Sequence, residues 1–206
     1  MHAVYQQARF LTSVRDVHRL PADKGFEVAF AGRSNAGKSS AINTICQQKA
    51  LARTSRTPGR TQMINFFTID GERRLVDLPG YGYAKAPTAM RRDWRILVEG
   101  YLAHRQSLRG IVIMMDIRRP LTDYDWQLLN WCQQAKLGIH ILLTKADKLR
   151  RGPRKSTLTA VRSDLGQAGT VASVSTFSAL KSDGLNEAWV VLDEWLKIER
   201  PKKAPV

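Results

Sequence analysis

The chain contains little of what several common classes of protein depend on. It has only two cysteines, Cys46 and Cys132, without CxxC spacing, so disulfide and zinc roles are not expected. No run of 18 apolar residues occurs, and the first residues lack the apolar core of a signal peptide. No lipidation motif is present either. These absences predict a soluble, cytoplasmic protein with reduced cysteines and no membrane association.

Acidic residues are also scarce, with 18 Asp and Glu against 33 Lys and Arg, which gives a formal net charge of +15. Such an excess favours a polyanionic partner, either nucleic acid or an acidic membrane. The apolar fraction of 43% and the charged fraction of 25% are ordinary for one globular domain. We expect a monomer with an extension (1–24) packed on a single domain (25–198) and a flexible basic tail (199–206).

Apolar runs typical of buried strands alternate with helical patterns along the chain. The expected strands are 26–31, 62–69, 74–76, 111–115, 139–143 and 171–177, and the expected helices are 88–104, one capped by Thr122 and Asp125, one from about 153, and 185–196. Asp70-Gly71 predicts a two-residue hairpin turn. In the extension, Phe10, Leu11, Val14 and Val17 have partly helical spacing. The pattern predicts a three-layer α/β fold with a mostly parallel six-stranded sheet and one antiparallel edge strand.

The segment Gly32–Ser39 reads GRSNAGKS and matches the phosphate-loop pattern GxxxxGK[ST]. It follows an apolar strand and precedes a helical pattern, which is the setting that such a loop requires. Backbone N–H groups and the positive helix end then face the anion. Lys38 is expected to reach the β- and γ-phosphates, and the Ser39 hydroxyl to bind magnesium. The motif predicts a nucleoside triphosphate site.

The choice of base is indicated by the tetrapeptide Thr144-Lys145-Ala146-Asp147, which comes directly after a buried strand. The carboxylate of Asp147 can accept hydrogen bonds from the guanine N1–H and amino group, a donor pair that adenine lacks at that edge. The stem of Lys145 can cover the plane of the base. A TKAD tetrapeptide is weak evidence alone, but directly after a buried strand it favours GTP and GDP over ATP. The alternative, an ATP-using kinase, is disfavoured because it would give Asp147 no role in binding the base.

In the order of its motifs the chain resembles the small GTPases, or Ras-like G domains. By that resemblance, Thr61 in PGRTQ is the magnesium-binding threonine of switch I, with Thr57 as the competing candidate. Asp77-Leu78-Pro79-Gly80 resembles DxxG, which implies that Asp77 holds magnesium through water and that Gly80 contacts the γ-phosphate. Thr144–Asp147 resembles NKxD with Thr for Asn, and Phe177-Ser178-Ala179 resembles the fifth motif.

The segments GRSNAGKSS, PGRTQ, DLPGYGYA and TKADK together resemble the EngB (YihA/YsxC) family of bacterial ribosome-biogenesis GTPases, within the TrmE-Era-EngA-EngB-Septin-like superfamily. The resemblance implies a GTPase switch in assembly of the large ribosomal subunit, with its precursor and rRNA as partners and a link to cell division and septation. The implied metal residues are Ser39, Thr61 and Asp77. The implied nucleotide-binding residues are Gly32, Arg33, Ser34, Asn35, Ala36, Gly37, Lys38, Ser39, Ser40, Gly59, Arg60, Thr61, Asp77, Gly80, Thr144, Lys145, Asp147, Phe177, Ser178 and Ala179.

Two positions depart from better known GTPases. Tyr81 follows Gly80 where Ras-like proteins place a water-orienting glutamine, so slow intrinsic hydrolysis is expected and no catalytic base is named. Asn35 stands where related GTPases bind potassium, with hydrogen bonding within the loop as the alternative role. Asn35 and Lys38 are the candidates for charge stabilisation. The alternative function is a nucleotide-dependent RNA- or ribosome-binding module with negligible turnover.

Three basic clusters stand out in the sequence. They are Arg53, Arg56 and Arg60; Arg91, Arg92 and Arg95; and Lys148, Arg150, Arg151, Arg154 and Lys155. The first two border the expected nucleotide-sensing loops, which favours contacts with RNA phosphates, while solvated helix faces are the alternative. No DNA specificity is expected, and a peripheral membrane GTPase ranks last. Tyr81 and Tyr83 are expected to pack beneath the switch, with base stacking as the alternative.

Overall fold

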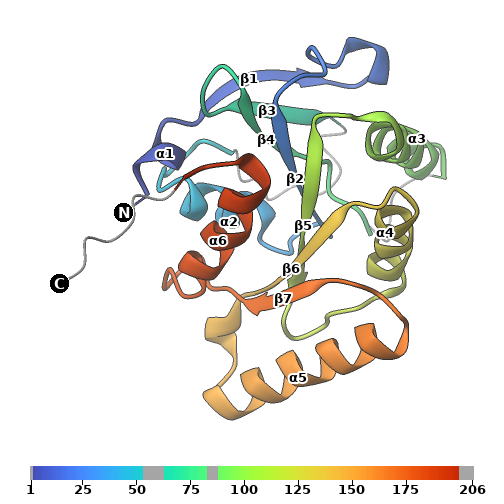
Figure 1. The fold of residues 1–206 in the computed structure, drawn as a ribbon. Coiled ribbons are helices and arrows are strands. Elements are labelled where there is room, and N and C mark those ends of the chain that lie inside the picture. The colour runs from blue at the N-terminus through green and yellow to red at the C-terminus, as the bar shows by residue number, and fades with distance from the viewer. Residues whose placement is uncertain (1, 53–62, 83–87, 200–206) are drawn as a thin grey trace.

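The computed structural model describes residues 2–52, 63–82 and 88–199. Seven strands form one sheet in the order β1-β3-β4-β2-β5-β6-β7 (Figure 1). The strands β4, β2, β5, β6 and β7 are parallel neighbours, whereas β3 is antiparallel to both β4 and β1. Their bounds are β1 Arg9–Val14, β2 Phe26–Gly32, β3 Ile64–Thr68, β4 Arg73–Asp77, β5 Leu108–Asp116, β6 Gly138–Thr144 and β7 Ser173–Thr176.

The sheet has one strand more than the six predicted, because the extension supplies β1. Its spacing indicated a partly helical segment, but residues 9–14 pair along the free edge of β3, from Arg9 opposite Thr68 to Val14 opposite Ile64. Leu11 is an extra residue in this ladder, between the pairs formed by Phe10 and Thr12. Backbone hydrogen bonds offered by the neighbouring edge outweigh a weak local preference.

Helices cover both faces of the sheet (Figure 1). On one face α1 (Ala3–Gln6), α2 (Lys38–Ile45) and α6 (Leu185–Leu196) share a core with Val112 and Met114 of β5. On the other, α3 (Thr88–His104), α4 (Asp123–Gln134) and α5 (Arg151–Gln167) share a core with alternate β5 residues such as Ile111 and Ile113. The short 3-10 helices are η1 (Val17–Arg19) and η2 (Ala146–Lys148). The alternation follows from strand geometry, in which successive side chains point to opposite faces.

The predicted bounds of α3 are confirmed, and so is the capping box of α4. The Thr122 backbone N–H and hydroxyl donate to Asp125 Oδ2 at 2.8 and 2.7 Å. The hairpin turn differs from the prediction, because residues 69–72, and not two residues, connect β3 to β4. The Asp70 carboxylate holds this longer connection by accepting from the N–H groups of Glu72 at 2.8 Å and Arg73 at 2.7 Å.

Helix α6 approaches the sheet closely where two strands carry glycine. A Cβ atom added to Gly110 would lie 2.5 Å from the ring of Trp195, and one added to Gly138 would lie 3.0 Å from it. The absence of these side chains lets the indole lie flat against β5 and β6. Among the described residues, no helix is both long and apolar enough to cross a membrane.

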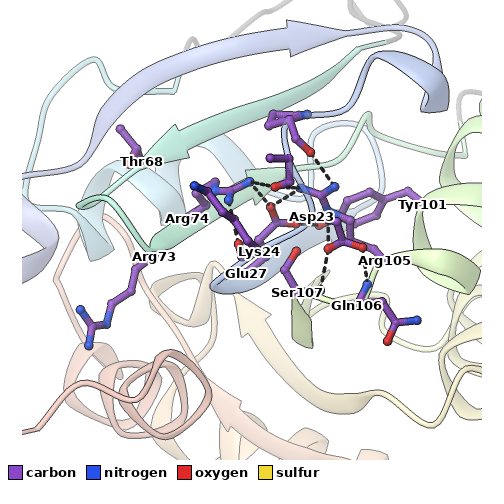
Figure 2. A network of polar contacts seen from close by, with 12 residues as sticks. Asp23, Lys24, Glu27, Thr68, Arg73, Arg74, Tyr101, Arg105, Gln106 and Ser107 are labelled. Carbon is purple, nitrogen blue, oxygen red and sulfur yellow. Dashed lines mark hydrogen bonds and ion pairs between the residues drawn. The ribbon is translucent and has the colours of Figure 1, made fainter.

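A buried polar network lies at the start of β2 (Figure 2). Glu27, which is fully buried, accepts hydrogen bonds from Arg74 at 2.8 Å, from Arg105 at 2.8 and 2.6 Å and from the Tyr101 hydroxyl at 3.0 Å. Arg105 also donates to the Pro21 carbonyl at 2.8 Å. The network therefore joins the residues that lead into β2 to β4 and to the C-terminal end of α3.

Candidate nucleotide site

The phosphate-loop motif forms the connection between β2 and α2. Gly32 ends β2, Asn35 and Gly37 have φ angles of 66° and 90°, and α2 begins at Lys38. A Cβ atom on Gly32 would lie 2.8 Å from the Met114 carbonyl oxygen, so the close approach of β5 requires glycine there. The other predicted phosphate-binding residues lie in the same connection. They are Arg33, Ser34 and Ala36 in the loop and Ser39 and Ser40 in the first turn of α2. Unpaired N–H groups of that turn are available to an anion.

Lys38 and Asp77 meet directly in an ion pair between α2 and the end of β4. Both side chains are largely buried, with 12% and 9% of their surface exposed. Asn65, on the neighbouring strand β3 and in register with Asp77, donates a hydrogen bond to the second carboxylate oxygen at 3.3 Å. Motif analysis missed Asn65, and the predicted two-residue turn would have placed Asn65 opposite Val76 and not opposite Asp77.

The DxxG segment lies along the phosphate loop. Ser34 N–H donates to the Tyr81 carbonyl at 2.8 Å, and Tyr81 N–H donates to the Gly32 carbonyl at 3.3 Å. A Cβ atom on Gly80 would lie 3.3 Å from Ser34 Oγ, so Gly80 packs directly against the loop. Any displacement of the DxxG segment must therefore break these contacts with the phosphate loop.

The Tyr81 side chain points into the core. It is buried, and its hydroxyl donates to Asp125 Oδ1 at 2.7 Å. Burial, with Asp125 adding to it, raises the pKa of the Tyr81 hydroxyl well above its ordinary range. Its ring lies 5.7 Å from that of Trp94 on α3, whose indole N–H donates to the Pro79 carbonyl at 2.8 Å. The packing expected for Tyr81 is confirmed; Tyr83 lies outside the described residues.

Thr144 and Lys145 connect the predicted guanine motif to the phosphate loop. Thr144 Oγ1, at the end of β6, lies 2.6 Å from the Ala36 carbonyl and 3.1 Å from the Met115 carbonyl and donates toward both. Lys145 Nζ donates to the Asn35 carbonyl at 2.7 Å and pairs with Asp116 at 3.0 Å. The two motifs, more than a hundred residues apart, are therefore joined by direct hydrogen bonds into one corner of the structure.

Asp147 is oriented by the fifth motif. Ser178 is fully buried, and its hydroxyl donates to Asp147 Oδ1 at 2.7 Å. This hydrogen bond lowers the pKa of Asp147. Phe177 is buried beside it and accepts from Ala146 N–H at 3.0 Å, while Ala179 continues the loop against the core under α2. The structure thus holds an ionised carboxylate in one orientation at this edge of the sheet.

The predicted residues converge on the carboxyl ends of β2, β4, β6 and β7, where ligands of open α/β sheets bind. Gly59, Arg60 and Thr61 lie outside the described residues, as does the competing Thr57. Asp116, at the end of β5, was not predicted. The hydrogen bond from Arg118 lowers the pKa of Asp116, and Lys145 contributes to the same effect. The sequence did carry a signal for Asp116, because it is an acidic residue at the end of an apolar run predicted to be a strand.

The family pattern described as 50S ribosome-binding GTPase matches residues 27–145. "Probable GTP-binding protein EngB" of Hydrogenovibrio crunogenus is 51% identical over 203 residues, which cover 98% of this chain and 96% of the relative. The chain belongs to the EngB family of GTPases. Its members' activity, the hydrolysis of GTP, is therefore the activity of this chain, and the predicted resemblance is confirmed.

Solved structures agree with the EngB-family fold. A crystal structure of a probable GTP-binding protein EngB has a TM-score of 0.64 at 15% identity, covering 84% of this chain and 99% of that one. Era in complex with MgGDPNP and a segment of 16S ribosomal RNA has a TM-score of 0.64 at 22% identity, covering 89% of this chain and 59% of that one. At these identities the likeness shows the fold, a P-loop GTPase domain with a mostly parallel sheet.

Proposed function

We propose that this GTPase acts as a slow molecular switch in assembly of the large ribosomal subunit, in the cytoplasm, with GTP and GDP bound at the corner formed by the phosphate loop and the TKAD segment. The observation that carries the proposal is the pairing of Asp147 with Ser178. One oxygen of this ionised carboxylate is held by Ser178, and the other lies 3.7 Å from the exposed Lys148 Nζ, from which it can turn to accept from the pair of donors on guanine. Lys145, anchored on the Asn35 carbonyl, brings that carboxylate into register with the phosphate loop.

Magnesium suits the oxygen donors near the phosphate loop. Ser39 offers a hydroxyl, and Asp77 a carboxylate that its ion pair with Lys38 keeps near α2. Hydroxyl, carboxylate, water and phosphate oxygens are the ligands that this ion prefers. When bound, the ion would neutralise charge on the β- and γ-phosphates. We expect the Lys38–Asp77 ion pair to separate as nucleotide binds, with Lys38 turning to phosphate and Asp77 to a metal-bound water. Thr61 stays a proposal for a further magnesium ligand.

The ribosomal role is supported by charge and by family. A net charge of +15 suits a partner made of RNA, and the matching family pattern is described as ribosome-binding. Arg92 and Arg95 lie exposed on α3, which follows the DxxG segment in the chain, and Trp94 between them is bonded to Pro79. An RNA phosphate bound by these arginines would therefore sense rearrangement of the DxxG segment. Linkage then requires RNA to change the affinity for GTP in return.

A binding module with negligible turnover is the second candidate. It is favoured by Tyr81, whose hydroxyl is bonded to Asp125 in the core, so that the residue after Gly80 presents no group to an attacking water. Slow intrinsic hydrolysis follows from the same geometry. Potassium at Asn35 is a separate proposal for supplying the missing charge, and equal turnover in potassium and sodium buffers would count against it.

Base selectivity is tested by fluorescent GDP binding, with GTP, ATP and xanthine nucleotides as competitors. The variants are Asp147→Asn and, as a matched control, Asp164→Asn on the exposed face of α5. We expect Asp147→Asn to lose guanine preference and gain affinity for xanthine nucleotides, while Asp164→Asn behaves as the wild type. Equal binding of ATP by the wild type, or an unaffected Asp147→Asn variant, would refute the assignment of the base site.

The switch itself is tested by single-turnover GTP hydrolysis with and without large ribosomal subunits. Stimulation by the particles, together with GTP-dependent association that weakens steeply with salt, is the expected result. Association without any turnover in either condition would favour the binding module. An absence of association in both nucleotide states would refute the ribosomal role.

A further inference from the structure

A cavity of about 530 Å³ lies beside the phosphate loop, against the Asp116–Arg119 turn and the first residues of α4. Its volume is in the range of small-molecule sites. Its lining includes four cationic side chains, Arg33, Arg118, Arg119 and Lys145. Of the described residues proposed to hold magnesium or read the base, Ser39, Asp77, Asp147 and Ser178 do not line it, nor does Lys38. The cavity therefore shares Arg33, Ser34, Asn35, Ala36 and Lys145 with the predicted nucleotide-binding residues, while the proposed magnesium ligands and the base-reading carboxylate lie outside its lining.

The two carboxylates in the cavity wall already have partners. Asp116 accepts two hydrogen bonds from Arg118, at 2.9 and 2.6 Å, and pairs with Lys145 at 3.0 Å. Asp125 accepts from the Tyr81 hydroxyl on one oxygen and from Thr122 on the other. Neither acid is left to attract a cation, so the lining does not resemble a metal site.

Two arginines of the lining still have N–H groups available as hydrogen-bond donors. Arg33 Nε is buried and has no hydrogen-bond partner within the part of the chain that the structure describes. Arg119 is exposed at the mouth, and its guanidinium makes no hydrogen bond or ion pair to any described residue. Guanidinium groups present planar forks of N–H donors whose geometry matches phosphate oxygens. The available N–H donors of Arg33 and Arg119 therefore have the charge and the geometry to bind a phosphate group.

We propose that this cavity binds a phosphate group other than those of the guanine nucleotide, held chiefly by Arg33 and Arg119. Two sources share this chemistry, a phosphodiester of bound RNA and a phosphorylated small molecule. Arg33 lies within the phosphate loop, and a Cβ on Gly82 would be 3.1 Å from its Nε. Occupancy is therefore coupled to the loop that holds nucleotide and to the segment after DxxG. The site stands independently of the ribosomal role proposed above.

The test uses the full chain loaded with magnesium and a non-hydrolysable GTP analogue, so that the γ-phosphate position is filled. Inorganic phosphate is titrated while the arginine Nε–H signals are followed by ¹H–¹⁵N NMR. We expect saturable shifts of the Arg33 and Arg119 signals. Arg119→Gln should weaken phosphate binding at least about fivefold, through loss of a charge-assisted contact, with analogue affinity unchanged. The matched control is Arg151→Gln, an exposed arginine at the start of α5, which should bind phosphate as the wild type.

Competition then identifies the source of the phosphate. An RNA oligonucleotide without terminal phosphates, displacing inorganic phosphate at lower concentration than AMP does, assigns the site to RNA; the reverse order assigns it to a small phosphorylated molecule. Shifts that stay linear in phosphate concentration and include Arg151 would overturn the proposal, as would equal weakening by Arg119→Gln and Arg151→Gln. Neither result would bear on guanine binding or on hydrolysis with ribosomal particles.

Discussion

The histidine in the middle of the sheet makes the stability of this protein depend on pH in a calculable way. His140 on β6 is 3% exposed, and its ring nitrogens lie 2.7 Å from Ser173 Oγ and 3.0 Å from Ser175 Oγ on β7. Burial lowers the pKa of His140 from 6.5 to about 4, because an imidazolium there would lose its hydration. The folded protein therefore keeps this ring neutral in a range where the unfolded chain takes up a proton.

The sign follows from proton uptake by the two states. Between pH 6.5 and about 4 the unfolded state binds more protons at His140, so the free energy of unfolding falls as the pH is lowered. At about 1.4 kcal/mol for each unit of pKa difference, the full loss is about 3 kcal/mol, and about 2 kcal/mol of it has occurred on going from pH 7 to pH 5. The loss levels off as the pH falls through about 4, where the folded ring also takes up a proton.

Urea unfolding at pH 7 and at pH 5 measures the effect, with His140→Asn as the variant. Asparagine retains an amide for the serine hydroxyls but does not titrate, and the carboxylates titrate alike in both proteins. The wild type should lose about 2 kcal/mol more than the variant between the two pH values. His104→Asn, at the exposed end of α3, should lose as much as the wild type. Equal losses in the wild type and His140→Asn would refute the buried neutral ring.

Three further substitutions test packing and the site. Glu27→Gln should lower the free energy of unfolding by about 3 kcal/mol, because two buried guanidinium groups lose their counter-charge; a change below about 1 kcal/mol in urea unfolding would contradict the network. Gly110→Ala should lower the free energy of unfolding by about 1–3 kcal/mol, because the added methyl group would collide with Trp195. Gly166→Ala, which has open space around it in α5, should leave the free energy of unfolding unchanged or raise it. An equal decrease in both variants would contradict the packing of Trp195 on Gly110. Thr144→Val should weaken fluorescent GDP binding about fivefold by removing the bond to the phosphate loop, and unchanged binding would deny that the corner positions the nucleotide.

The fold class and the elements that carry the motifs could be predicted from the sequence. Apolar runs ending in Gly32, Asp77 and Thr144 place the motifs at strand ends, and parallel strands bring such ends to one edge of a sheet. The capping box at Thr122 was also visible, because its two partners are three residues apart. Local patterns were sufficient wherever the interaction itself is local.

Long-range pairings left no comparable signal. The Glu27 network joins residues from three separate segments, and although Glu27 lies within the apolar run 26–31, no local pattern identifies Arg74, Tyr101 or Arg105 as its partners. The edge strand β1 was missed because its pairing partners in β3 lie 50 to 59 residues away along the chain and the local spacing is ambiguous. Asn65 and Asp125 acquire their contacts with Asp77 and Tyr81 only when the sheet and α4 are assembled.

The edge strand β1 also bears on the solubility of this protein. Without it, β3 would present unpaired N–H and C=O groups flanked by Phe66 and Phe67, a template on which strands of other molecules could assemble. β1 covers that template and ends the sheet with a bulge at Leu11 and with polar residues such as Thr12 and Ser13, features that discourage further strand addition. Residues 9–14 thus occupy an edge to which strands of other molecules could otherwise add.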